Sequence, residues 1–291
     1  MYARPTWRVV PFLLATALIG GCDAPPRADG PDASAPAVVD ADGRTVRLDG
    51  PATRIVSLVP SATLTLGALA AQGQVVARTD FDTVGWARDL PSVGGGLEPS
   101  MEAVVASRPD LVIRFGGPQD PDTPRRLDAL GIAHVALRPD RITDVLDGIR
   151  LLGVVSGHEQ AAASLTSTIR DTLDAIRARS AQAPPVRVAY VLGGTPPWVA
   201  GPGTYIDELI RLAGGVNVFS DLGKLYGSVS PEEFVARDID VVMTPRGSRF
   251  QRRLVPDARF VEAGPDMELP GPGVMEAARE MERALRPGGA P

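Results

Sequence analysis

The chain is poor in residue types on which many enzymes and nucleic-acid-binding proteins depend. Its 291 residues include one cysteine, two histidines and one lysine, and the net charge is −5. The lone Cys22 has no partner for a disulfide within the chain. The acidic balance argues against a nucleic-acid partner, because phosphate binding requires a basic surface. The hydrophobic content of 44% indicates a folded globular protein.

Catalytic sequence motifs are also missing. The chain has no Gly-x-Ser-x-Gly, no His-Glu-x-x-His and no Walker loop, so hydrolase chemistry is disfavoured. His134 falls in a predicted strand, where we expect it to pack in the core, and His158 falls at a helix start. We therefore expect a protein that is not an enzyme and has no metal site and no cofactor.

The first 22 residues have the pattern of an export signal. Arg4 and Arg8 precede an apolar run of about eleven residues, which is followed by small residues, as in a secretory signal peptide. The run is too short to span a membrane. It ends in Leu-Ile-Gly-Gly-Cys22, which resembles the bacterial lipobox, whose cysteine is acylated. We expect residues 1–22 to be a lipoprotein signal peptide and Cys22 to be its lipidation site; a plain signal peptide is the alternative.

Residues 23–37 follow with mostly Pro, Ala, Asp and Gly, and this composition predicts a flexible tether. Together, the signal peptide and the tether predict an exported domain. A lipid on Cys22 would hold that domain to a bacterial membrane, facing the periplasm or the cell exterior.

Apolar runs alternate with helical patterns over residues 38–150. Residues 38–48 predict a β-hairpin at Asp42-Gly43. Strands are expected at 54–59, 75–78, 111–115 and 134–137. Helices are expected at 62–72, capped by Ser61 or Thr63, and at 100–106 and 122–130. Strands that are apolar throughout and alternate with helices predict a mainly parallel sheet covered on both faces.

A long helical stretch separates this region from a second α/β region. Residues 151–183 are expected to form a connecting helix, with Ser156 and Glu159 as its capping box and Pro184 at its end. The alternation then resumes over 184–291, with strands at 186–192 and 239–243 and helices at 205–213, 231–236 and 273–285. The expected fold class is α/β, with two Rossmann-like lobes joined by one long helix.

One motif occurs in both lobes. LEPSMEAVVASRPDLVI, residues 97–113, is echoed by VSPEEFVARDIDVVM, residues 229–243. Glu102 corresponds to Glu232, and Asp110 corresponds to Asp240. Each copy predicts an acid at a helix start, followed by a buried strand. The repeat indicates a weak internal duplication.

Several segments in order resemble the substrate-binding proteins of ABC importers for cobalamin, haem and ferric siderophores. They are RIVSLVPSAT (54–63), LPSVG (90–94), Glu102 with RPDLVI (108–113), VAGPG (199–203), AGGVNVF (213–219) and VSPE (229–232). The resemblance implies two lobes on a rigid helix with the ligand between them. It implies that Glu102 and Glu232 dock on a permease, although Glu233 competes for the second role. The partners it implies are an ABC permease, its ATPase and a small metal-chelate ligand, bound by a monomer.

Aromatic residues point to the class of ligand. They make up 5% of the chain, yet Phe81 beside Asp80, Phe115, Trp198 and Tyr226 fall just past or near predicted strands, where α/β lobes bind ligands. Large rings suit a large, flat ligand. The resemblance places Phe115, Trp198 and Tyr226 where cobalamin binders carry aromatics, so a corrinoid is favoured.

Other features keep alternatives open. Gly95-Gly96 and Leu64 depart from the pattern of cobalamin binders. Arg246, with Arg249, Arg252 and Arg253, could bind the carboxylates of haem or of a ferric siderophore. A surface enzyme or adaptor on this fold is the alternative from a different class.

Overall fold

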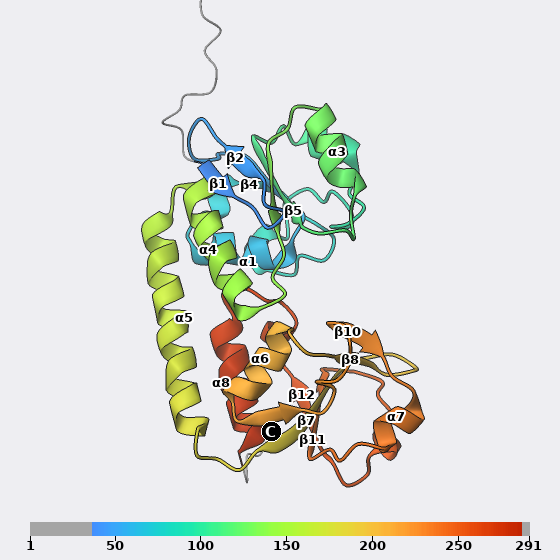
Figure 1. The fold of residues 1–291 in the computed structure, drawn as a ribbon. Coiled ribbons are helices and arrows are strands. Elements are labelled where there is room, and N and C mark those ends of the chain that lie inside the picture. Colours follow the sequence, from blue (N-terminus) through green and yellow to red (C-terminus); the bar gives the residue numbers. More distant parts are fainter. Residues whose placement is uncertain (1–36, 287–291) are drawn as a thin grey trace, which may run out of the picture.

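Two α/β lobes joined by a long helix make up the described part of the chain (Figure 1). The structure, a computed structural model, describes residues 37–286. The predicted signal peptide, Cys22 and residues 23–36 of the predicted tether lie outside this range. The expected fold class is confirmed. Within the described range, no helix combines the length and the apolar character that crossing a membrane requires.

The N-terminal lobe is built on four parallel strands in the order β4-β3-β5-β6. An antiparallel hairpin, β1 with β2, precedes them. The strands are β1 (Ala37–Val39), β2 (Thr45–Arg47), β3 (Ile55–Ser57), β4 (Val75–Ala77), β5 (Leu111–Phe115) and β6 (His134–Leu137). The helices are α1 (Pro60–Ala68), α2 (Met101–Ala106), α3 (Asp122–Ala129) and α4 (Ile142–Ser156), with 3₁₀ turns at Gln72–Gln74 and Gly85–Ala87.

The C-terminal lobe has a mixed sheet in the order β10-β8-β7-β11-β12, with β9 also paired to β7. Strands β9, β7, β11 and β12 are parallel, whereas β8 pairs antiparallel with β7 and β10 pairs antiparallel with β8. The strands are β7 (Val186–Gly193), β8 (Trp198–Ala200), β9 (Gly215–Asn217), β10 (Tyr226–Ser228), β11 (Val241–Pro245) and β12 (Arg259–Ala263). The helices are α6 (Tyr205–Leu212), α7 (Pro231–Val235) and α8 (Val274–Leu285), with 3₁₀ turns at Arg252–Leu254 and Pro265–Met267.

Helix α5 (Glu159–Ser180) connects the lobes and runs along one side of both (Figure 1). It packs against α4 of the first lobe and against α6 and α8 of the second. Arg179 of α5 donates to both carboxylate oxygens of Glu282 in α8, at 2.8 and 2.9 Å. These contacts fix the connecting helix to both lobes.

Two predicted helix starts are wrong. Ser156 is the last residue of α4, where its hydroxyl donates to the Leu152 carbonyl at 2.6 Å, and it does not cap α5. The chain breaks at Gly157, whose φ of 74° is left-handed and favours glycine. Likewise, α1 begins at Pro60 without a side-chain cap from Ser61 or Thr63. Proline has no N–H to satisfy at a helix start, so this position needs no capping side chain.

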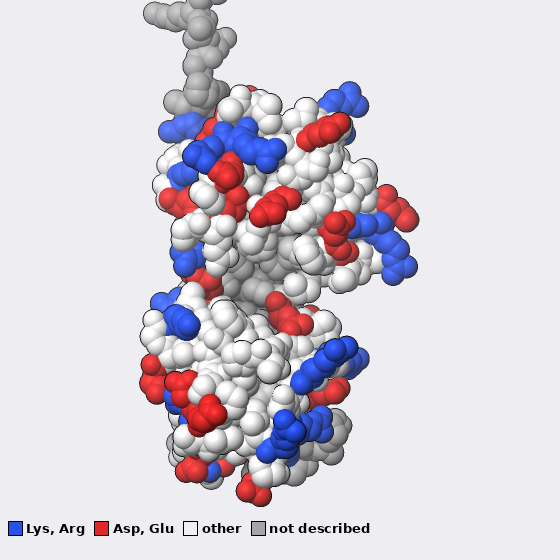
Figure 2. Space-filling model, turned by 90° about the vertical axis from the view of Figure 1, so that its right-hand side faces the viewer, with Lys and Arg blue, Asp and Glu red and all other residues white. Residues whose placement is uncertain are grey.

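The lobes also touch beside α5. The amide of Tyr205, the first residue of α6, donates to the Asp140 carbonyl at 2.6 Å. The amide of Ile142, the first residue of α4, donates to Glu208 Oε2 at 2.8 Å. These contacts close one side of the interface between the lobes and leave a recess on another side, which Figure 2 shows.

Candidate ligand-binding cleft

A cavity of about 410 Å³ lies between the two lobes. From the N-terminal lobe it is lined by residues 115, 116, 118, 119 and 137–140, which follow strands β5 and β6. From the C-terminal lobe it is lined by Tyr190, Leu192, Tyr205, Ile206, Tyr226, Glu268 and Pro270. The first group lies at the carboxyl ends of parallel strands, which is where α/β sheets bind ligands.

Phe115, the last residue of β5, is the aromatic ring that the N-terminal lobe contributes. The loop holding Gly96 packs directly against it. A Cβ added to Gly96 would lie 2.3 Å from the Leu58 carbonyl oxygen and 3.0 Å from Cε2 of Phe115. Glycine is therefore required at this position for the ring to lie where it does.

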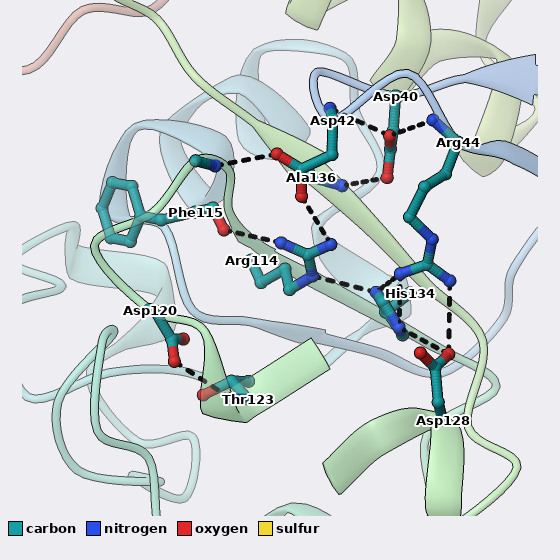
Figure 3. A network of polar contacts seen from close by, with 11 residues as sticks. Asp40, Asp42, Arg44, Arg114, Phe115, Asp120, Thr123, Asp128, His134 and Ala136 are labelled. Carbon is teal, nitrogen blue, oxygen red and sulfur yellow. Dashed lines mark hydrogen bonds and ion pairs between the residues drawn. The ribbon is translucent and has the colours of Figure 1, made fainter. Parts of the chain in front are cut away.

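A buried polar network holds the backbone at Phe115 (Figure 3). Arg114 is 1% exposed, and its Nη2 lies 2.8 Å from Oδ2 of Asp42, in the turn between β1 and β2. Its Nη1 donates to the Phe115 carbonyl at 2.9 Å, and its Nε donates to Nδ1 of His134 at 2.9 Å. The N-terminal hairpin is thereby tied to the strand that ends at the cavity.

His134 completes this network from β6. The ring is 1% exposed, and its Nε2 lies 3.1 Å from Oδ1 of Asp128. Burial lowers the pKa of His134, the hydrogen bond to Asp128 opposes this, and the charges of Arg44 and Arg114 lower it further. His134 is thus a buried residue of a core strand, as predicted. Among residues 37–286, no group of three or more His, Cys, Asp or Glu side chains is placed to hold a metal ion.

Three tyrosines form the C-terminal side of the cavity. Tyr190 and Tyr205 are 0% and 3% exposed, and within residues 37–286 neither hydroxyl has a hydrogen-bond partner. Burial raises the pKa of both phenols, and it raises that of Tyr226 to about 12. A buried hydroxyl without a partner costs about 1–3 kcal/mol, so two of them bordering one cavity indicate a functional site.

Of the charged side chains that line the cavity, two form an ion pair and one has no partner within residues 37–286. Nε of Arg138 lies 2.7 Å from Oδ2 of Asp140. Glu268 has no side-chain hydrogen bond or ion pair with the described residues, and partial burial raises its pKa. The lining therefore carries one unpaired carboxylate.

The residues predicted to bind the ligand are only partly brought together. Phe115 and Tyr226 line the cavity, whereas Asp80, Phe81, Trp198 and Arg246 do not. Phe81 and Trp198 are 68% and 45% exposed, and Asp80 accepts a hydrogen bond from Ser92 at 2.5 Å. Arg246 is exposed after β11. A ligand contact for these four residues stays a prediction.

Tyr190, Tyr205 and Glu268 were not among the ligand-binding residues predicted from the sequence. Tyr190 alone left a signal, because it is a residue with a polar tip in the apolar strand 186–192. The other two come from separate segments, α6 and the loop after β12, which only the fold brings to the cavity.

The two predicted docking acids occupy matching positions. Glu102 and Glu232 are each the second residue of a helix, α2 or α7, and both are exposed. Ser100 and Ser230 cap these helices, accepting hydrogen bonds at 3.3 and 3.1 Å from backbone amides. The carboxylate of the neighbouring Glu233 is already used within the helix cap, because it accepts a hydrogen bond from the Ser230 amide at 2.8 Å. This leaves Glu232 as the counterpart of Glu102.

Comparison with known proteins gives consistent matches. A cobalamin-binding protein of Halobacterium salinarum is 34% identical over 215 residues, which are 70% of this chain and 57% of that protein. The periplasmic vitamin B12 binding protein of Vibrio cholerae superposes with a TM-score of 0.71 at 25% identity, covering 81% of this chain and 97% of that one. The periplasmic haem binding protein of Vibrio cholerae has the same fold, with a TM-score of 0.71 at 22% identity, covering 81% and 99%.

Residues 55–255 match the profile of the family described as periplasmic binding protein. The match spans both lobes, the connecting helix and most of the cavity lining. With its two α/β lobes and the cavity between them, this chain belongs to the periplasmic binding protein family, whose members are exported solute-binding proteins and not enzymes.

Proposed function

We propose that the chain is a lipid-anchored receptor that captures a corrinoid between its lobes and delivers it to an ABC permease with its ATPase. The observation that carries the proposal is the interlobe cavity, which is lined by Phe115 of one lobe and by three tyrosines of the other. Aromatic walls with a few polar groups suit a large, flat and partly apolar ring.

The size of the cavity is compatible with one edge of such a ring. Its volume is about 410 Å³, and Figure 2 shows an open recess between the lobes. A corrinoid can enter with one edge while the rest of the molecule fills the recess. Phe81 and Trp198, both exposed, are then candidates for contacts at the rim.

The similarity to cobalamin-binding and vitamin B12 binding proteins supports a corrinoid over other metal chelates. Haem or a ferric siderophore is the alternative ligand. The sequence argument for it was that arginines after β11 could bind the carboxylates of such a ligand. Arg246, Arg249, Arg252 and Arg253 are all exposed, and none lines the cavity.

Delivery rests on the two exposed acids and on the anchor. Glu102 and Glu232 are exposed, their carboxylates make no hydrogen bond or ion pair with the described residues, and they lie at the starts of equivalent helices. An acylated Cys22 and a tether over residues 23–36 would keep the receptor close to the permease. Two acids on separate lobes would hold both lobes against it.

A calorimetric titration tests the choice of ligand. Soluble residues 23–291 are titrated with cyanocobalamin, haemin and a ferric hydroxamate siderophore, and the melting temperature is followed for each. We expect cyanocobalamin to bind saturably at one site and to raise the melting temperature, because a ligand that binds the native state stabilises it. Binding of haemin without binding of cyanocobalamin would refute the corrinoid assignment.

A further inference from the structure

The unpartnered hydroxyls of Tyr190 and Tyr205 distinguish this cavity from the rest of the core. The equivalent of Tyr190 in the other lobe is Ser57, because Ser57 pairs with Ile113 of β5 as Tyr190 pairs with Met243 of β11. Ser57 is also fully buried, but its hydroxyl donates to the Val59 carbonyl at 3.1 Å. The fold can therefore satisfy a polar group at this position, and at Tyr190 it does not.

The two hydroxyls are available as donors. Phenylalanine would fill the same buried volume without a polar atom, so packing alone gives no reason for tyrosine at 190 or 205. Burial raises the pKa of both phenols, and the nearby carboxyl group of Glu268 raises them further. Each therefore keeps its proton and offers one O–H to a ligand, which argues against a phenolate bound to iron.

The charge in the cavity limits what those donors can meet. Arg138 is the one basic residue among the lining side chains, and it is paired with Asp140. Glu268 is left without a cation among the described residues. A ligand carboxylate would be repelled by Glu268, whereas an amide can accept from a tyrosine and donate to Glu268.

We propose that Tyr190, Tyr205 and Glu268 make the cleft select metal chelates whose rim carries neutral amide groups over chelates whose rim carries carboxylates. The tyrosine hydroxyls donate to amide carbonyl oxygens, and Glu268 accepts from an amide N–H group. This inference rests on the proposed capture of a corrinoid and adds the chemistry by which the site recognises its rim.

A pair of ligands with the same ring isolates the rim. The purified full chain is titrated at pH 8 with cyanocobalamin, whose side chains are amides, and with its tricarboxylic acid, in which three of those amides are hydrolysed to carboxylates while the nucleotide loop is kept. We expect cyanocobalamin to bind at least about 100-fold more tightly, the product of several charge and hydrogen-bond terms of about tenfold each. Glu268→Gln should reduce this preference about tenfold by removing the repulsion.

Matched variants separate recognition from general effects. Glu262→Gln removes the same charge from an exposed position on β12 outside the cavity, and it should leave the preference unchanged. Tyr190→Phe and Tyr205→Phe should each weaken cyanocobalamin binding about fivefold through a lost hydrogen bond. Neither should lower the melting temperature of the free protein, because each deletes a hydroxyl that has no partner there.

The outcomes separate this inference from the proposed function. If cyanocobalamin binds and neither the tyrosine variants nor Glu268→Gln alter affinity or preference, the inference is wrong and the corrinoid receptor stands. Equal or tighter binding of the tricarboxylic acid by the unaltered protein overturns the inference as well. If neither corrinoid binds, the proposed function fails and the inference fails with it.

Discussion

The two lobes share one parallel core and differ at the ends of its strands. The order β4-β3-β5-β6 in the first lobe corresponds to β9-β7-β11-β12 in the second. Asp110 accepts from the Arg54 amide at 3.0 Å, and Asp240 accepts from the Arg187 amide at 2.8 Å, just before β5 and β11. Both lobes thus preserve the segment that holds Glu102 or Glu232.

The carboxyl ends of β5 and β11 differ between the lobes. Arg114 and Phe115 at the end of β5 correspond to Thr244 and Pro245 at the end of β11. His134 corresponds to Phe260, which lies 6.2 Å from Phe250 in an aromatic cluster. The first lobe therefore contains a buried polar network where the second has an apolar core. The lobes therefore share the segments that carry Glu102 and Glu232 and differ at the carboxyl ends of β5 and β11.

The largest expected effect comes from Glu102 and Glu232, the exposed acids at the starts of equivalent helices in the two lobes. Glu102→Arg combined with Glu232→Arg should abolish cobalamin uptake, because both proposed contacts with the permease become repulsive. The affinity for cobalamin should not change, since neither residue lines the cavity. Uptake in cells and calorimetry on the purified variant measure the two quantities.

A matched pair controls for the cost of placing a base at a helix start. Glu159→Arg with Glu276→Arg also reverses two first-turn acids, in α5 and α8. This pair should leave uptake intact. Normal uptake by the Glu102 and Glu232 double variant would remove the docking role.

The next largest effect, on the free energy of unfolding, is expected in the buried polar network around Arg114, compared with the equivalent position, Thr244, in the other lobe. Arg114→Met should lower the free energy of unfolding by about 3–5 kcal/mol, because it leaves buried partners of the guanidinium unpaired. Thr244→Val, at the equivalent position, removes a hydroxyl with no side-chain hydrogen bond among the described residues and should cost less than about 1 kcal/mol. Urea unfolding measures both. Equal losses for the two variants would show that the network adds no special stability.

A smaller effect, on cobalamin affinity, is expected from substitutions at the carboxyl ends of β5 and β11. Phe115→Ala should weaken cobalamin binding about tenfold, the result of losing roughly 1.4 kcal/mol of aromatic contact. Pro245→Ala alters the equivalent residue of the other lobe, which does not line the cavity, and should leave affinity unchanged. If Pro245→Ala weakens cobalamin binding as much as Phe115→Ala does, the ring is not bound by the end of β5 alone, and the prediction fails.

The smallest effect is the pH dependence of the network. The pKa of His134 is held below its ordinary value of 6.5 in the folded protein, so the unfolded chain takes up this proton first as the pH falls. The free energy of unfolding should therefore decrease from pH 7 to pH 5. His134→Gln should show a shallower decrease in urea titrations at each pH, and His158→Gln should match the unaltered protein. An equal slope for His134→Gln would exclude His134 as the cause.

Much of the fold could be predicted from the sequence because long apolar strands and periodic helices carry their own signals. Strands β5 and β6 begin and end at the predicted residues. Strands β8, β9, β10 and β12 were not predicted, because segments such as GVN and YGS are too short and too polar to carry a strand signal of their own. The Ser156 cap was wrong because the left-handed Gly157 ends α4 and starts a new helix after it.

The site was less predictable for a physical reason. Phe115 and Tyr226 could be found because they follow or lie near apolar segments. Tyr190 lines the cavity from within the buried strand β7. Glu268 lines it from a loop after β12 that carries no sequence motif. Which groups lack a partner is a property of packing between lobes, and no local pattern encodes it.

The central claim is that the ligand binds in the cavity between the two lobes, and a crystal structure of the protein with cyanocobalamin tests it most directly. We predict that the corrin ring lies between Phe115 and Tyr226, with amide groups within hydrogen-bond distance of the Tyr190 and Tyr205 hydroxyls. A corrinoid bound outside the interlobe cavity, or no corrinoid bound at saturating concentration, would contradict the claim.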